Sequence, residues 1–259
     1  MTLITSVLAT VRKALSDAKV VVWALDVDGT LVPFASHPNE VRIPDSLQQD
    51  LATIHAFENM AVLIISGRSR ADLLRLFGRN FPGILIGNHG LDTGQESSSA
   101  AAAQRPPEAW REALASLLKR WPHAWLEDKG PTWAIHWRQV LPSEESHLVQ
   151  ELQKFASNAH HPLYACRFGD AVLDIFPKDG NKGTALISWI TAHYGTSWES
   201  RVYPIAIGDD QTDDDMFRAI AGQGLSVLVG HRPTNLAQIR FSSPNEVLML
   251  LSRVAQMSL

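Results

Sequence analysis

The sequence predicts an α/β protein with a parallel-sheet core and an inserted α+β domain, and three observations support this. Continuous β-branched and aromatic runs, typical of strands buried on both faces, alternate with helical periodicity in the first part of the chain. The same alternation returns in the last part. Between them the order becomes helix, strand, strand, helix, strand, strand, which suits an open antiparallel sheet with helices on one face. We therefore expect a core of residues 1–99 and 178–259, with an insert at 100–177.

The core elements are expected where short apolar runs end in polar turns and where apolar residues recur with a helical period. Pro44 near one helix start and Gly78 after another helix mark two boundaries. In chain order we expect strand 20–25, helix 44–58, strand 61–65, helix 70–77, strand 84–86, helix 182–194, strand 202–207, helix 212–221, strand 225–229 and helix 245–257.

The insert is introduced by residues 96–107, which are small, polar and proline-terminated, as in a linker or exposed loop. Its tryptophans, at positions 121, 125, 133 and 137, are expected to pack in a core rather than to form a ligand platform. The expected elements are helix 108–120, strand 124–127, strand 133–137, helix 144–158, strand 163–168 and strand 171–176.

Composition excludes several classes of protein. The 259 residues are 45% hydrophobic and 19% charged with a formal net charge of −4, which gives no basic footprint for nucleic acid. No apolar stretch is long enough to span a membrane, and the first residues lack the basic and apolar regions of a signal peptide. The single cysteine, Cys166, cannot form an internal disulfide and is expected to be packed and inert. We expect a cytoplasmic monomer.

Polar residues follow three of the predicted core strands. Asp26 and Asp28 follow the first strand, Ser66–Arg68 the second, and Gly208–Asp213 the strand that begins at Val202. Ligands bind at the carboxyl ends of strands in such sheets, so these segments are expected to converge. Buried carboxylates need neutralisation, which Mg²⁺ bound to oxygen ligands provides, and a carboxylate can also act as a nucleophile. The alternative is a pair of surface or helix-capping aspartates.

These segments carry a family resemblance. Four segments resemble, in order, the four motifs of the haloacid dehalogenase-like phosphatase superfamily. They are Asp26-Val27-Asp28-Gly29-Thr30-Leu31, Ser66, Lys182 and Gly208–Asp213. Within that superfamily the chain resembles the trehalose-6-phosphate phosphatases. The resemblance implies a Rossmann-like core, a C2-type cap inserted before the third motif, Mg²⁺ as cofactor and a sugar phosphate as substrate. The matching segments are Ser66-Gly67-Arg68, Gly87-Asn88-His89-Gly90, Glu127–Gly130, His136-Trp137-Arg138, Lys182-Gly183 and Gly208–Asp213.

The resemblance implies four catalytic residues. Asp26 would attack phosphorus and form an aspartyl-phosphate. Asp28 would protonate the leaving sugar oxygen and then activate water, an acid-then-base alternation that suits a carboxyl group. Ser66 would donate a hydrogen bond to a phosphoryl oxygen, and Lys182 would neutralise developing charge beside the nucleophile.

The resemblance also implies the metal site. Asp26, the backbone carbonyl of Asp28 and Asp209 would hold Mg²⁺. Asp213 and Asp210 would support this site from its second layer, and Asp213 is alternatively a partner of Lys182.

Other readings of the same residues stay open. Arg68 either clamps phosphate or forms a structural salt bridge, and Lys182 is otherwise an exposed lysine in a first helical turn. Thr212 with Asp215 resembles a capping box, in which case the acidic run from Asp213 serves the helix start.

The insert is expected to set substrate specificity. In the resemblance Glu127 and Lys129 contact the sugar, although each can instead form a surface ion pair. The family usually has a glutamate where Asp174 stands and a basic residue where Phe176 stands, which puts the sugar in doubt. The residues expected to bind substrate are Arg68, His89, Glu127, Lys129, His136, Arg138 and Asp174.

The leading hypothesis is therefore hydrolysis of trehalose 6-phosphate. One alternative keeps the mechanism with another sugar, such as sucrose phosphate, a mannosyl-phosphoglycerate or a hexose phosphate. The other is a catalytically silent phosphosugar-binding protein.

Overall fold

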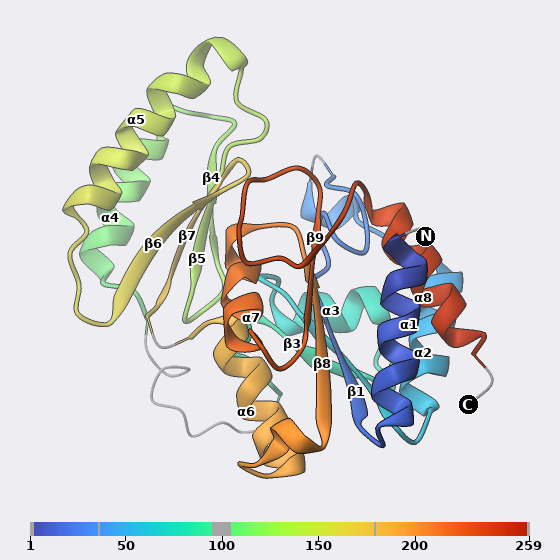
Figure 1. Cartoon of the computed structure of the whole chain (residues 1–259). Helices are drawn as coiled ribbons and strands as arrows, with labels where there is room; N and C mark the ends of the chain where they lie inside the picture. Colours follow the sequence, from blue (N-terminus) through green and yellow to red (C-terminus); the bar gives the residue numbers. More distant parts are fainter. Residues whose placement is uncertain (1–2, 36, 95–104, 179, 258–259) are drawn as a thin grey trace. The chain divides into compact units, whose positions relative to one another are not determined.

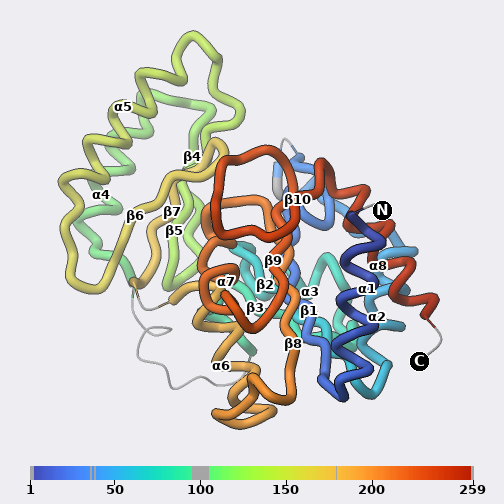
Figure 2. Tube along the Cα trace, in the orientation of Figure 1, coloured from blue at the N-terminus to red at the C-terminus, as the bar shows by residue number. Residues whose placement is uncertain are grey.

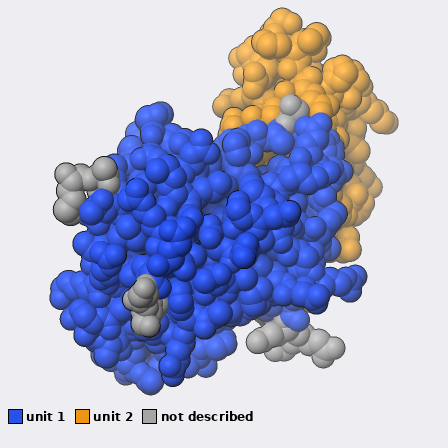
Figure 3. All heavy atoms as spheres, turned by 90° about the vertical axis from the view of Figure 1, so that its right-hand side faces the viewer, with its two compact units in different colours: residues 1–95, 181–259 blue, residues 96–180 orange. Residues whose placement is uncertain are grey.

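A computed structural model describes residues 3–35, 37–94, 105–178 and 180–257. The chain forms two compact units, residues 1–95 with 181–259 and residues 96–180, coloured separately in Figure 3. The insert expected at 100–177 lies within the second unit. Most of the expected linker, residues 96–104, lies outside the described residues. Over the described residues, no helix has the length and apolar character that a membrane span requires.

The first unit alternates strands and helices along the chain (Figure 1). Its elements are α1 (Leu3–Ser16), β1 (Val20–Leu25), η1 (Pro38–Glu40), α2 (Asp45–Ala56), β2 (Met60–Ile65), α3 (Arg70–Phe77), β3 (Ile84–Ile86), η2 (Asn88–Gly90), α6 (Lys182–Tyr194), η3 (Trp198–Ser200), β8 (Val202–Gly208), η4 (Gln211–Asp213), α7 (Asp214–Ala219), β9 (Leu225–Val229), β10 (Ile239–Phe241) and α8 (Pro244–Ala255), where η marks 3₁₀ turns.

One six-stranded parallel sheet forms the centre of this unit, in the order β10-β9-β8-β1-β2-β3, and its trace can be followed in Figure 2. Strand β1 lies between β8 and β2, and Leu25 is opposite Ile64 on one side and Ile207 on the other. These three strands therefore end at nearly the same level. The segments that follow them, which begin at Asp26, Ser66 and Gly208, meet at one edge of the sheet, where parallel sheets bind ligands.

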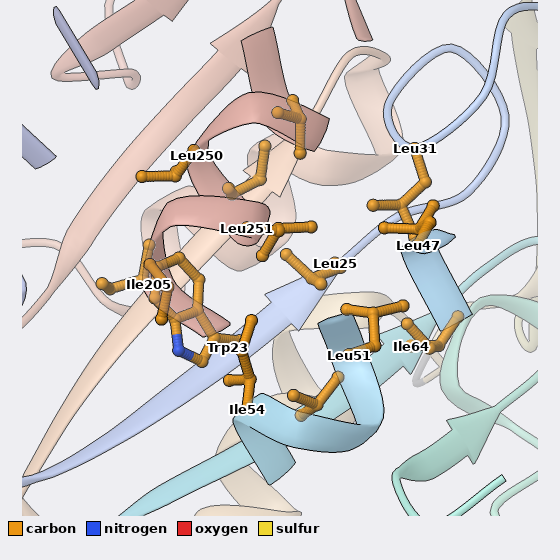
Figure 4. Packing of buried hydrophobic residues seen from close by; sticks show 14 of the residues in the cluster. Trp23, Leu25, Leu31, Leu47, Leu51, Ile54, Ile64, Ile205, Leu250 and Leu251 are labelled. Carbon is orange, nitrogen blue, oxygen red and sulfur yellow. The ribbon is translucent and has the colours of Figure 1, made fainter. Parts of the chain in front are cut away.

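Helices cover both faces of this sheet because β1 is apolar on both faces. Trp23 and Leu25 pack in a cluster with leucines of α2 and α8, as Figure 4 shows, and α1 contributes to the same cluster. Val22 and Ala24 belong to the cluster on the opposite face, with residues of α6 and α7. Burying a side chain of this size contributes about 1.5–3 kcal/mol. The strand that ends in the acidic motif is thus held from both sides.

The second unit has a four-stranded antiparallel sheet in the order β4-β5-β7-β6. Leu114, Leu148 and Leu152 of its two helices pack with Trp133 and Ile135 of the sheet. The tryptophans at 133 and 137 are buried here, as expected of packing residues. The elements are α4 (Glu108–Leu118), β4 (Trp125–Asp128), β5 (Trp133–His136), α5 (Pro142–Asn158), β6 (Tyr164–Gly169) and β7 (Val172–Pro177).

Four features differ from the expectations. Helix α1 and strand β10 were not predicted. The helix expected at 212–221 is a 3₁₀ turn followed by the shorter α7. The capping box expected for Thr212 and Asp215 is wrong, because the box is formed by Asp210 and Asp213, two positions earlier. The turn between β8 and α7 brings the Asp213 carboxylate to the backbone N–H groups of Asp209 and Asp210.

Candidate active site

Asp26, Lys182 and Asp213 form a buried ionic cluster at the ends of β1 and β8. Lys182 Nζ donates to Asp26 Oδ1 and to Asp213 Oδ1, each at 2.7 Å. The three residues are 5%, 2% and 0% exposed. Because removing one partner from a buried ion pair leaves an uncompensated charge, this arrangement is held strongly in place.

The position of Lys182 follows from the local sequence of α6. Asn181 is the N-cap, and its side chain accepts a hydrogen bond from the backbone N–H of Thr184. Lys182 is therefore the first helical residue, where a cation is disfavoured by the helix dipole. The carboxylates of Asp26 and Asp213 offset this cost. The alternative of an exposed first-turn lysine is wrong.

Asp209 lies beside this cluster on the turn after β8. Its Oδ1 accepts a hydrogen bond of 3.0 Å from Thr30 Oγ1, and its backbone N–H donates to Asp213 Oδ2 at 2.9 Å. Carboxylate oxygens of Asp26, Asp209 and Asp213 lie within 4.8 Å of one another. Gly29 has φ +82°, and a Cβ there would overlap the Asp209 carboxyl group, so the close approach of the two loops requires glycine.

Both carboxylate oxygens of Asp28 accept hydrogen bonds from Arg68. Arg68 Nε donates to Asp28 Oδ2 at 2.6 Å, and a terminal nitrogen donates to Oδ1 at 2.7 Å, which makes a two-pronged ion pair. Ser66 is buried and its Oγ accepts from the N–H of Arg68 at 3.3 Å. Of the two readings of Arg68, the structure shows the salt bridge.

His89 reaches this region through an unusual loop. Asn88 and His89 both have positive φ, of 50° and 55°, which is uncommon for residues with a side chain. Their N–H groups donate to the carbonyls of Arg68 and Ser66, at 2.7 and 2.9 Å. A Cβ on Gly67 would lie 2.6 Å from the imidazole ring, so the loop after β2 and the loop after β3 touch through a glycine.

The charges of the site do not balance. Asp26, Asp28, Asp209 and Asp213 supply four carboxylates, whereas Lys182 and Arg68 supply two cations. Burial raises the pKa of Asp26 to about 7, against the opposing charge of Lys182. Burial, followed by the charges of Asp26 and Asp213, raises the pKa of Asp209 to about 9. Burial opposes the charged form of Lys182, but the carboxylates of Asp213 and Asp26 outweigh it and raise the pKa of the lysine.

This imbalance fits a divalent cation. The excess is two negative charges, and the donors are carboxylate oxygens, which are the ligands that Mg²⁺ prefers. Asp26 and Asp209 can hold such an ion, with the Asp213 carboxylate beside them. The Asp210 side chain accepts a hydrogen bond from the N–H of Gln211 at the start of η4.

In the second unit, Glu127 joins two other predicted substrate-binding residues. His136 Nε2 lies 2.8 Å from Glu127 Oε2, and Lys129 Nζ lies 3.5 Å from the same oxygen. Burial would raise the pKa of Glu127, but the hydrogen bond from His136 and the charge of Lys129 lower it to about 2. The indole of Trp125 stacks on His136, with ring centroids 5.0 Å apart. These residues form a preorganised polar cluster on β4 and β5.

Asp174 lies on another strand of the same sheet, and Arg138 lies in the turn after β5. Asp174 on β7 is opposite Arg167 on β6. The Arg167 guanidinium lies 4.7 Å from the centroid of the Phe176 ring, so a cation from the neighbouring strand reaches the position that usually carries a basic residue. Arg138 forms an exposed ion pair with Asp170, at 2.8 Å.

Sequence reasoning did not single out two groups that organise the site. Thr30 is part of the first motif, but nothing local indicates that its hydroxyl holds Asp209. Arg232 lies in the loop after β9 and contacts the backbone of Asp209 and Asp210. No nearby motif identifies Arg232, because its partners come from a distant loop.

Solved structures share this arrangement of elements, and they include a member of the haloacid dehalogenase-like superfamily. The C-terminal domain of Candida albicans trehalose-6-phosphate phosphatase aligns with a TM-score of 0.80 and 22% identity, over 97% of this chain and 98% of that one. A sugar phosphatase of subclass IIB of this superfamily aligns with a TM-score of 0.56 and 18% identity, over 92% of this chain and 98% of that one. At these identities the likeness establishes the fold.

Sequence comparison narrows the class to one family. Residues 24–243 match the trehalose-phosphatase family. The trehalose-6-phosphate phosphatase of Escherichia coli strain K12 is 30% identical over 80% of this chain and 77% of its own length. A probable trehalose-phosphate phosphatase of Sinorhizobium fredii is 33% identical over 80% of this chain and 78% of its own length. The chain belongs to the trehalose-phosphatase family.

Proposed function

We propose that this chain hydrolyses trehalose 6-phosphate to trehalose and phosphate through an aspartyl-phosphate on Asp26. The observation that carries the proposal is the buried Asp26 carboxylate, which Lys182 holds through one oxygen beside the carboxylates of Asp209 and Asp213. A carboxylate fixed in this way can act as a nucleophile toward phosphorus. The substrate is inferred from membership of the trehalose-phosphatase family.

The reaction has two steps. An Asp26 oxygen attacks phosphorus, the bond from phosphorus to the sugar oxygen breaks, and Asp28 gives that oxygen a proton. Water then attacks the aspartyl-phosphate, Asp28 takes a proton from the water, and Asp26 is released with inorganic phosphate. Lys182 neutralises charge next to Asp26, and Ser66 donates a hydrogen bond to a phosphoryl oxygen.

Mg²⁺ is the proposed cofactor. Asp26, the backbone carbonyl of Asp28 and Asp209 would hold it, and Asp213 would support this set through Lys182 and the N–H of Asp209. When bound, the ion supplies Lewis-acid stabilisation of charge on the phosphoryl oxygens.

Arg68 has to release Asp28 before Asp28 can act as an acid. The ion pair occupies both carboxylate oxygens, so neither of them is open toward a leaving group. The substrate phosphate carries more negative charge than a carboxylate, so it would attract the Arg68 guanidinium away from Asp28. In this proposal Arg68 exchanges one anionic partner for another, and one Asp28 oxygen becomes available to carry the proton.

The polar cluster of the second unit is the proposed source of sugar specificity. Glu127, Lys129 and His136 are already joined by hydrogen bonds and charge, so little ordering is needed when they bind hydroxyl groups. Asp174, on the same sheet, is proposed as a further contact to the sugar, and His89 as a contact in the first unit.

Phosphate release from a panel of sugar phosphates tests the proposal, first with Mg²⁺ and then with a chelator. We expect turnover of trehalose 6-phosphate that stops when the metal is removed. Asp26→Asn should abolish turnover while circular dichroism shows an intact fold. Turnover of sucrose phosphate but not of trehalose 6-phosphate would overturn the substrate. Absence of turnover with every member of the panel would indicate a phosphosugar-binding protein.

A further inference from the structure

Arg232, in the loop between β9 and β10, fastens the turn that carries Asp209. Its Nε donates to the carbonyl of Asp209 at 3.2 Å, and one terminal nitrogen donates to the carbonyl of Asp210 at 3.0 Å. The two terminal nitrogens also grip the Asp214 carboxylate, at 2.7 and 3.0 Å. One guanidinium thus joins two consecutive peptide carbonyls of the turn to the first residue of α7.

The turn is held from two sides. On one side, Asp213 Oδ2 accepts from the N–H groups of Asp209 and Asp210, at 2.9 and 3.0 Å. On the other side, Arg232 donates to the carbonyls of the same two residues. Both the N–H and the C=O of Asp209 are therefore occupied, which fixes the backbone from which its carboxylate projects.

Arg232 is itself well anchored. The carbonyl of Arg232 accepts a hydrogen bond of 2.7 Å from Arg240, whose guanidinium also donates to the carbonyl of Gly230 at 3.0 Å. Thr234 adds a contact of 3.3 Å to the Asp214 carboxylate that Arg232 grips. Such a fork needs the planar guanidinium, because the compact ammonium of lysine cannot reach a carboxylate and two carbonyls together.

We propose that Arg232 is a positioning residue that orients Asp209 for the divalent cation. This inference rests on the proposed function, since it takes Asp209 to be a metal ligand. Arg232 supplies no ligand itself. Loss of its contacts should weaken metal binding while the chemical step at saturating metal is largely kept. Outer groups that orient metal ligands typically change metal affinity by about 10–100-fold.

The experiment compares Arg232→Gln and Arg232→Lys with the control Arg218→Gln. Arg218 pairs with Asp215 on the same helix, α7, and its side chain is 62% exposed. Mg²⁺ binding is measured directly by titration calorimetry in the absence of substrate, kcat and KM are measured at saturating Mg²⁺, and urea unfolding reports folding.

Both Arg232 variants should bind Mg²⁺ about tenfold or more weakly than the unchanged chain, with kcat at saturating Mg²⁺ within about threefold. Lysine should not rescue. Arg218→Gln should bind Mg²⁺ as the unchanged chain does. If either Arg232 variant folds and binds Mg²⁺ within about twofold of the unchanged chain, the inference is overturned.

A milder variant keeps the proposal testable if both Arg232 variants fail to fold. Asp214→Asn weakens the fork on α7 but leaves the bonds from Arg232 to the two carbonyls in place. It should weaken Mg²⁺ binding less than tenfold but more than Arg218→Gln does, and equality with Arg218→Gln would overturn the inference. If the unchanged chain binds Mg²⁺ no better than Asp209→Asn, the proposed metal site itself is wrong.

Discussion

Replacing Lys182 by methionine is the sharpest perturbation of this site, because it removes one buried cation from between two carboxylates. Each of its N···O distances is 2.7 Å, which corresponds to about 6 kcal/mol of attraction at an effective dielectric constant of about 20. The desolvation of the three groups offsets much of this attraction. Removing one partner of a buried pair costs about 3–5 kcal/mol in measured cases.

Proton uptake sets an upper limit to the same cost. Uptake of one proton by Asp26 would restore the net charge of the Lys182→Met site. In the unfolded chain this carboxyl group has its ordinary pKa of 3.8 and is ionised. Relative to that state, holding the proton costs about 5 kcal/mol at about pH 7.5 and about 2 kcal/mol at about pH 5.5. We therefore expect the free energy of unfolding to fall by about 3–5 kcal/mol at the higher pH and by about 2 kcal/mol or less at the lower pH.

Urea unfolding at the two pH values, in the presence of a chelator, measures this difference. Lys13→Met is the matched control, since its ion pair with Asp17 is exposed and should contribute less than about 1 kcal/mol. Phosphate release by Lys182→Met should fall by about a hundredfold or more. A loss of stability below about 1 kcal/mol at the higher pH, or a loss that does not depend on pH, would refute the electrostatic reasoning.

Three further predictions concern other groups. Without metal, the raised pKa values of Asp26 (about 7) and Asp209 (about 9) mean that the folded state holds protons which the unfolded state releases above an ordinary pKa of 3.8. The stabilisation from these two groups is then fully present below pH 3.8 and is lost as the pH rises toward 9. Chelated protein should therefore unfold at lower urea concentration as the pH rises from about 5.5 to 8.5. A flat profile would contradict this prediction. Glu127→Gln should raise KM for trehalose 6-phosphate about tenfold, because one charged hydrogen-bond partner of the sugar is lost. Hydrolysis of p-nitrophenyl phosphate, which lacks the sugar, should change little. Equal losses with both substrates would argue against sugar contact. Burial raises the pKa of the Cys166 thiol to about 11, so a thiol reagent at about pH 7.5 should label native protein far more slowly than protein in urea, and equal rates would show that the thiol is accessible.

The sequence alone determined the class of fold and the edge of the sheet that carries the acidic residues. Strand β1 is apolar on both faces and ends abruptly in Asp26, which predicts a buried parallel strand with a ligand edge. The short strand β10 was missed because three residues show no usable periodicity. Helix α1 was also missed, although its apolar residues recur at helical spacing and Val7 and Val11 are buried.

Only the tertiary structure decided which charges meet. Lys182 and Asp26 are 156 positions apart, and Arg232 reaches Asp209 from 23 positions away across the end of β9. Arg68 meets Asp28 from 40 positions away. Local patterns encode burial and periodicity, whereas ion pairing depends on distances of a few ångströms that are set by strand order and loop path. For this reason the motifs predicted which residues come together at the site, but they did not predict its charge balance.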